Sequence, residues 1–165
     1  MAMPSRINSS ILEMRNEMSD PNGKPPETIN EIMSKNVQTV TPDTLLKDVA
    51  KAMHQHDCGS ILVVKEDRIV GIITDRDIAL RCVAASHHPD KTTAAQVMTS
   101  DILYCRDSDS TDDVAKNMGR NKVRRLAVLD VNKRLVGIVT LGDLASHTNY
   151  LLCGEMLGKI CREAA

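Results

Sequence analysis

The feature that most constrains this chain is a short string that occurs twice. Residues 71–78 read GIITDRDI, and residues 137–144 read GIVTLGDL. In both copies a Gly precedes a β-branched apolar run, a Thr follows the run, and an Asp stands three residues after the Thr. These Thr and Asp residues are Thr74 and Asp77 in the first copy, and Thr140 and Asp143 in the second. The apolar run predicts a buried strand, and the apolar spacing that follows predicts a helix starting near Asp75.

A strand that feeds directly into a helix creates a candidate ligand site at the turn. The free N–H groups of a helix N-terminus attract anions, and the helix dipole favours an Asp in the first turn. That carboxylate can accept hydrogen bonds from two vicinal hydroxyls, such as those of a ribose. The alternative is that Thr and Asp only cap the helix. The repetition favours a binding role, because capping does not require the preceding Gly and apolar run.

The repeat extends well beyond this string. Met33 corresponds to Met98, 65 residues later, whereas Gly71 corresponds to Gly137, 66 residues later. The extra residue falls in a polar hairpin turn, where a fold tolerates an insertion. Strands are expected at residues 37–41, 59–64, 69–74, 102–106 and 124–129, and a helix opened by Pro42, Asp43 and Thr44 should bury Leu45, Leu46, Val49, Ala50 and Met53.

Each repeat therefore reads β-α-β-β-α, which predicts an α/β (α+β) fold. One unit of this size leaves an apolar face uncovered, so two should pack into a single core. The expected boundaries are a helical appendage and linker at 1–28, repeats at 29–86 and 87–147, and a C-terminal helix at 148–165. The N-terminal apolar stripe Ile7, Ile11, Met14 and Met18 is too short to form a stable isolated helix, so it should dock on its own domain or on a partner subunit.

Composition excludes several classes of function. The net charge is −1, and the chain has no Phe or Trp, so we expect no nucleic-acid partner. No apolar run approaches a membrane span, and the N-terminus lacks the apolar core of a signal peptide, so no membrane association is expected. Five scattered cysteines without a CxxC pair indicate a reducing, cytoplasmic location, and neither they nor the histidines suggest a metal site.

At this point the chain resembles a known family. Two β-α-β-β-α repeats that each end in GhhTxxD resemble a tandem pair of cystathionine-β-synthase (CBS) domains, also called a Bateman module. The likeness spans about Ile29 to Ala145, and the string TDRDI is shared with small stand-alone bacterial CBS-pair proteins. It is carried further by Val37, Thr39, Val40 and Pro42, and by the strand Val123–Val128. The resemblance implies a pseudo-twofold pair with two clefts, adenine nucleotide ligands such as AMP, ADP or ATP, and a homodimer.

The resemblance also implies roles for individual residues. Asp77 and Asp143 would accept the ribose hydroxyls, and Thr74 and Thr140 would contact ribose or phosphate. The surroundings of Thr39, Val40 and Pro42, and of Tyr104 and Cys105, would line the base pockets, with Ile61 and Leu126 beneath them. Arg124 and Arg125 would bind phosphate; the first repeat has Gly59 and Ser60 there and would depend on Arg76. On this basis we expect the Asp143 site to bind adenosine phosphates more tightly than the Asp77 site.

Three functions are weighed. The first is a regulatory module that binds an adenine nucleotide, requires no cofactor for catalysis and acts through a partner protein; NAD or S-adenosylmethionine are alternative ligands. The second is an enzyme, which we do not expect, because enzymes that carry this module need a further catalytic domain of about 250 residues. The third is a dimeric adaptor that binds no nucleotide, whose T-x-x-D groups would have to be satisfied internally.

Overall fold

Two three-stranded sheets form the centre of the computed structural model, which describes residues 28–148 and 150–161. In the first sheet β1 (Thr39–Val40) lies parallel to β2 (Ser60–Lys65), which pairs antiparallel with β3 (Arg68–Thr74). The second sheet repeats this order with β4 (Tyr104–Arg106), β5 (Arg125–Leu129) and β6 (Leu135–Thr140). The predicted pair of β-α-β-β-α repeats is confirmed.

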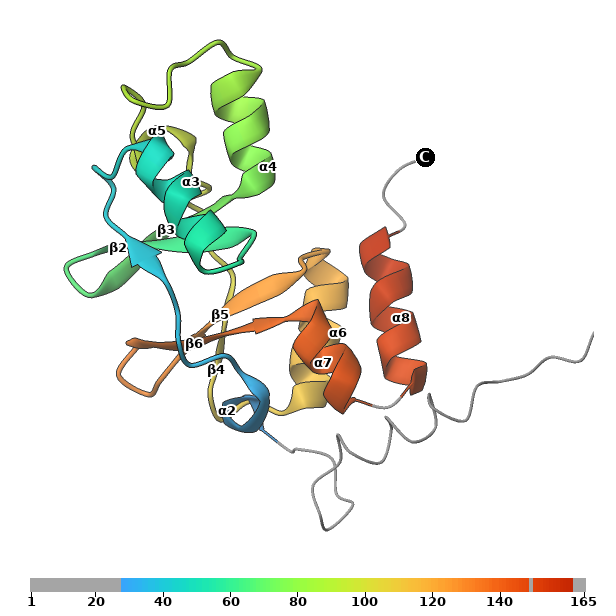
Figure 1. The fold of residues 1–165 in the computed structure, drawn as a ribbon. Coiled ribbons are helices and arrows are strands. Elements are labelled where there is room, and N and C mark those ends of the chain that lie inside the picture. Colours follow the sequence, from blue (N-terminus) through green and yellow to red (C-terminus); the bar gives the residue numbers. More distant parts are fainter. Residues whose placement is uncertain (1–27, 149, 162–165) are drawn as a thin grey trace, which may run out of the picture.

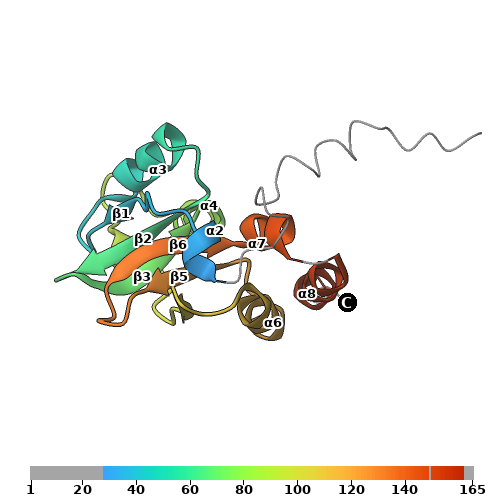
Figure 2. The ribbon, with the colours of Figure 1, turned by 90° about the horizontal axis from the view of Figure 1, so that it is seen from below.

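Helices connect the strands and cover the sheets. In each repeat one helix joins the first two strands: α3 (Leu46–Gln55) and α6 (Thr111–Asn121). A second helix follows the third strand: α4 (Asp75–Asp77) continues into the π-helix η1 (Ile78–Val83), and α7 (Leu141–His147) is followed by α8 (Tyr150–Cys161). Figure 2 shows the strands between α3 on one side and α6, α7 and α8 on the other.

Several predicted boundaries were wrong for local reasons. The helix α3 begins at Leu46, not at Pro42, because the Thr44 N–H donates to the Thr41 carbonyl in a turn and Leu45 is extended in a bridge with Thr93. Leu46, Val49 and Met53 are buried as expected, whereas Ala50 is exposed. The strands β1 and β4 are shorter than predicted, and the residues that precede them line clefts described below.

The two repeats exchange their first helices. The short helix α2 (Ile29–Ile32) precedes β1 in sequence, yet Ile29 and Ile32 are buried with Leu126 and Val139 of the second repeat. Conversely α5 (Ala94–Val97) precedes β4, yet its buried residues lie in the core of the first repeat. Figure 1 shows the blue α2 beside the orange α7, and α5 contacts β3 and η1 of the first repeat. We call α2 and α5 the leading helices.

The exchange explains the Gly that opens each copy of the repeated string. A Cβ added at Gly71 would lie 2.3 Å from the Met98 sulfur, and one added at Gly137 would lie 2.4 Å from the Met33 sulfur. Each Met directly follows a leading helix, and the chain after it bridges to the strand: Thr99 with Ile72, and Ser34 with Ile138. Glycine is thus required because the exchanged segment packs directly on the strand.

The N-terminal segment for which a docked helix was predicted lies outside the described residues. The predicted C-terminal helix is α8, which buries Leu152, Met156 and Ile160, while Leu151 is exposed. None of the helices in residues 28–148 and 150–161 is long and apolar enough to cross a membrane.

Candidate functional site

Both repeated strings fold into the same hydrogen-bonded turn. In the first copy Asp77 Oδ2 accepts hydrogen bonds from the Thr74 N–H at 2.9 Å and from the Thr74 hydroxyl at 2.7 Å. The Asp77 N–H donates back to Thr74 Oγ1 at 3.1 Å, which completes a capping box. Thr140 and Asp143 form the same box, with 2.7 Å for both bonds to Asp143 Oδ2. The capping interpretation is therefore correct for one oxygen of each carboxylate.

The second carboxylate oxygen distinguishes the two copies. Asp77 Oδ1 lies 3.3 Å from the Arg81 guanidinium, which also donates to the Val97 carbonyl at 2.7 Å. Arg81 therefore connects the Asp77 carboxylate to the last residue of α5. At the position equivalent to Arg81 the second repeat has His147, whose Nδ1 donates to the main-chain carbonyl of Asp143 at 2.8 Å instead. In the described part of the chain no ion pair reaches Asp143.

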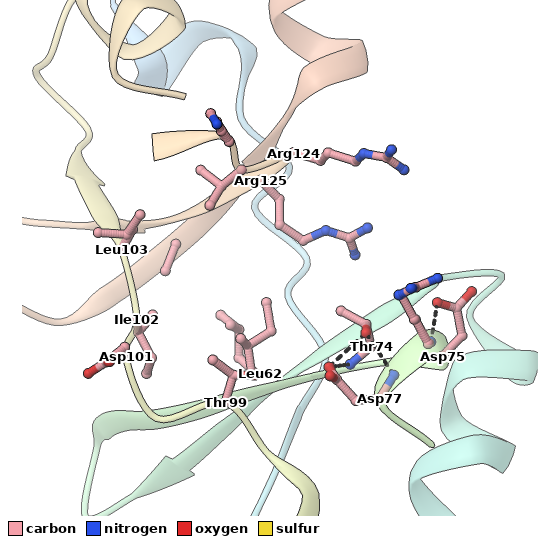
Figure 3. A pocket seen from close by; sticks show the side chains of 15 residues that line it. Leu62, Thr74, Asp75, Asp77, Thr99, Asp101, Ile102, Leu103, Arg124 and Arg125 are labelled. Carbon is pink, nitrogen blue, oxygen red and sulfur yellow. Dashed lines mark hydrogen bonds between the residues drawn. The ribbon is translucent and has the colours of Figure 1, made fainter. Parts of the chain in front are cut away.

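A cleft of about 590 Å³ opens beside the first turn; we call it the Asp77 cleft. Its walls come from both repeats and from the segment between α5 and β4, as Figure 3 shows. The apolar side chains that line it are Leu62, Ile72, Ile102, Leu103, Val123 and Ala127. Its volume is in the range of small-molecule sites.

In the Asp77 cleft an acidic side chain and basic side chains lie on opposite walls. Thr74 and Asp77 lie on one wall, and Arg124 and Arg125 lie at the start of β5 on the opposite wall. Figure 3 shows the Arg125 side chain extending toward the Thr74–Asp77 turn, with Arg124 beside it on the same wall. The remaining charged residues that line the cleft are Asp75, Arg76, Asp101 and Lys122. Guanidinium groups bind phosphate oxygens through paired, charge-assisted hydrogen bonds, and an aspartate accepts hydrogen bonds from hydroxyls.

A second cleft, of about 430 Å³, lies beside the second turn; we call it the Thr140 cleft. It is lined by the segment Ser34–Gln38, by the turn His56–Ser60, and by Thr140 and Ile138. These positions are equivalent to those of the Asp77 cleft, since Ser34 corresponds to Thr99 and Gly59 corresponds to Arg124 at the 65-residue offset. The Thr140 cleft is thus the pseudo-twofold counterpart of the Asp77 cleft. The turn His56–Ser60, which corresponds to the segment that supplies Arg124 and Arg125 to the Asp77 cleft, contains no arginine.

The structure brings together five of the predicted site residues in the Asp77 cleft: Thr74, Arg76, Asp77, Arg124 and Arg125. Thr140 lines the second cleft, and Asp143 is attached to it through the capping box. The residues predicted for the base pockets do not line either cleft; they are Thr39, Val40, Pro42, Ile61, Tyr104, Cys105 and Leu126.

Burial and strand direction explain why those residues miss the clefts. Ile61 and Leu126 are each 1% exposed and face the cores, whereas the next residue along each strand, Leu62 or Ala127, faces a cleft. Cys105 is also buried, and burial raises the pKa of its thiol to about 12. Tyr104 is 52% exposed, outside both clefts.

The expected grouping of Arg124 with Asp143 needs correction, whereas Arg125 lines both clefts. Both arginines line the cleft of Asp77, the motif of the other repeat. Sequence reasoning assigned each strand start to the motif of its own repeat, but the clefts lie between the repeats and take residues from each. The cleft residues Gln38 and Leu103 directly precede Thr39 and Tyr104, whose surroundings were expected to line the base pockets. Equivalent positions after the leading helices were the signal for the rest of the segments 34–38 and 99–103.

Metal binding and catalysis have little support from the described side chains. Within residues 28–148 and 150–161, no group of three or more His, Cys, Asp and Glu side chains could hold a metal ion. Cys82 is buried, and its thiol donates to the His87 carbonyl at 3.4 Å, so it is not poised as a nucleophile.

Comparison with known proteins gives consistent matches. A family model of the CBS domain matches residues 29–83 and again residues 94–149. The CBS domain-containing protein YhcV of Bacillus subtilis is 37% identical over 118 residues, which cover 72% of this chain and 83% of YhcV. Hypoxic response protein 1 of Mycobacterium tuberculosis is 32% identical over 139 residues, which cover 84% of this chain and 96% of that protein.

Two solved structures are informative neighbours. Hypoxic Response Protein I with two coordinated zinc ions is similar with a TM-score of 0.66 and 34% identity, over 74% of this chain and 99% of that chain. CBSX2 in complex with AMP is similar with a TM-score of 0.62 and 25% identity, over 73% of this chain and 94% of that chain.

Proposed function

The chain belongs to the CBS-domain family, and we propose that it is a regulatory module that binds an adenine nucleotide of the AMP, ADP or ATP class in the Asp77 cleft. The observation that carries this proposal is the placement of Asp77 opposite Arg124 and Arg125, across an apolar wall, in one cleft of suitable volume. The AMP complex of the similar protein CBSX2 supports the choice of ligand class.

Each part of the cleft has a role in this proposal. Asp77 keeps Oδ2 in the capping box, and Oδ1 accepts the ribose hydroxyls beside Arg81. The apolar side chains of the cleft, Ile102 and Leu103 among them, hold the adenine ring, because the faces of the ring are apolar. Arg124 and Arg125 bind the phosphate through paired hydrogen bonds.

The adaptor that binds no nucleotide is the second candidate, and the capping box is the observation that favours it. The capping box occupies only one oxygen of each motif Asp, however; the second oxygen of Asp77 pairs with Arg81, and no ion pair among the described residues reaches Asp143. The cations around the Asp77 cleft favour a phosphorylated ligand over the adaptor. NAD and S-adenosylmethionine remain alternative ligands, since both contain an adenosine. Catalysis is not part of the proposal, in keeping with the stand-alone CBS proteins that the chain is similar to.

A thermal-shift screen against AMP, ADP, ATP, NAD and S-adenosylmethionine tests the proposed function. A ligand at 100 times its Kd raises the free energy of unfolding by about 2.7 kcal/mol. For a domain of this size, we expect an increase in Tm of several degrees with at least one adenosine phosphate. If no ligand changes Tm even at millimolar concentration, the adaptor is the better account.

We also propose that the module forms a homodimer and acts on a partner protein from the cytoplasm. The support within the described residues is the exposure of Leu80 and Val83 on η1 and of Leu151 on α8, at 53%, 66% and 76%. Sedimentation at micromolar concentration tests self-association: a dimer is expected, and a monomer with and without AMP would contradict it.

A further inference from the structure

Arg125 lies between the two clefts and contributes to the lining of both. It lines the Asp77 cleft together with Arg124, and it also lines the Thr140 cleft. It starts β5, pairs in register with Thr140, and is half-buried. One side chain is therefore within reach of ligands in both clefts.

The two clefts are not equally supplied with positive charge. The residue equivalent to Arg125 in the first repeat is Ser60, and the residue equivalent to Arg124 is Gly59. Both line the Thr140 cleft, whose ionisable side chains are His56, Asp57, Cys58 and Arg125. Arg125 is thus the guanidinium on which a phosphate in that cleft would depend, and Asp57 adds a charge that repels phosphate.

The Asp77 cleft does not depend on Arg125 in the same way. Arg124, Arg76 and Lys122 also line it, so a phosphate there finds several cations. When a phosphate is bound in this cleft, Arg125 completes the cluster around it. A guanidinium has N–H donors on more than one edge, but one side chain extends into one cleft at a time. Arg125 extends toward the Thr74–Asp77 turn (Figure 3), so it has to turn away from that cleft to direct paired N–H groups at a phosphate in the Thr140 cleft.

We propose that the two clefts compete for Arg125, so that a phosphorylated ligand in the Asp77 cleft weakens the binding of a second one in the Thr140 cleft. The Thr140 cleft then takes an uncharged nucleoside independently of the first site. This inference rests on the proposed function and adds a negative coupling between its two sites. The physiological consequence is a module that responds to one nucleotide per chain although it has two clefts.

Calorimetric titration of the full chain can measure this coupling as a ratio of affinities. In the wild type, the second AMP binds the Thr140 cleft while the Asp77 cleft is filled. In Asp77→Ala, where the affinity of the Asp77 cleft for AMP is lower by about tenfold or more, AMP binds the Thr140 cleft before the Asp77 cleft is filled. We expect the second situation to give an affinity about tenfold higher or more, the effect of regaining one charge-assisted hydrogen-bond partner. Asp77→Asn, which retains an acceptor for the capping box, serves as a second variant if Asp77→Ala unfolds.

Matched controls separate the coupling from other effects. Adenosine has no phosphate, so the same ratio measured with adenosine should be close to one. Arg125→Gln should bring the AMP ratio close to one, whereas Arg124→Gln, which changes a residue of the Asp77 cleft alone, should leave it large. Ser60→Arg gives the Thr140 cleft its own guanidinium and should strengthen the second AMP step in the wild-type background.

The results distinguish this inference from the proposed function. AMP binding with a ratio near one in the wild type, or with a ratio that Arg125→Gln leaves unchanged, would overturn the competition while the proposed function stands. Absence of binding by both AMP and adenosine would overturn the proposed function and the competition together.

Discussion

Replacing Gly71 by Ala should destabilise the protein, because the leading helix α5 leaves no room for a methyl group. The added Cβ would lie 2.3 Å from the sulfur of Met98, 2.8 Å from its Cγ and 3.0 Å from its Cβ. The contact therefore involves the base of the Met98 side chain, so a rotation at its far end cannot relieve it. Extra methyl groups in a well-packed site cost about 1–3 kcal/mol. At about 2–4 °C per kcal/mol for a chain of this length, Tm should fall by about 2–12 °C.

A double-mutant cycle identifies Met98 as the cause. Gly71→Ala should cost less in a Met98→Ala background than in the wild type, because the clashing atoms are gone. Gly154→Ala is the matched control: a Cβ there meets nothing within 4 Å, and alanine in the helix α8 should raise the free energy of unfolding by up to about 1 kcal/mol. Equal Tm values for Gly71→Ala and the wild type, or equal costs in both backgrounds, would refute the exchange of leading helices as the reason for this glycine.

Two further predictions concern single side chains. Burial raises the pKa of the Cys105 thiol in the folded state to about 12, above its ordinary value near 9. As pH rises, the thiol of the unfolded chain therefore loses its proton first, so the free energy of unfolding should fall between about pH 9 and pH 12. The difference in free energy of unfolding between the wild type and Cys105→Val, measured by urea titration, should show this slope, and a flat difference would contradict it. Arg81→Met should weaken adenosine and AMP equally in the Asp77 cleft, because Arg81 positions the Asp77 carboxylate and touches no phosphate-binding residue; calorimetry that finds a loss for AMP alone would show that Arg81 binds phosphate instead.

The strands and helices of the repeats were predictable from the sequence because each of them occurs once in each repeat, so that one copy supports the assignment of the other. The alternation of apolar runs, the Thr that caps each motif helix and the hairpin that absorbs one inserted residue are local features. Local chemistry therefore predicted the strand-to-helix turn of Thr74 and Asp77. The capping box, which the sequence offered only as the alternative to a binding role, is present as well.

The composition of each cleft was not predictable in the same way. Arg124 precedes β5 of the second repeat, and it reaches the motif of the first repeat because the repeats pack against each other and exchange α2 and α5. A residue's sequence neighbours do not report such an exchange, so Arg124 was grouped with Asp143 although it lines the Asp77 cleft.

The face of β2 that lines a cleft was not predictable for a different reason: Ile61 was expected beneath a base pocket, whereas Leu62 lines the clefts. Ile61, Leu62 and Val63 are all buried, because β2 has a core on one face and a cleft between the repeats on the other. A strand buried on both faces lacks the alternation of apolar and polar residues that would show which side faces the ligand.

The central claim is that Asp77 and the arginines of the other repeat form one nucleotide site. Calorimetric titration of AMP and adenosine into the wild type, Asp77→Ala and Arg124→Ala tests it most directly. We predict that Asp77→Ala weakens both ligands by about tenfold or more, the effect of losing a charged hydrogen-bond partner, and that Arg124→Ala weakens AMP but leaves adenosine nearly unchanged. The account is contradicted if Asp77→Ala leaves the tightest AMP binding intact while Asp143→Ala abolishes it.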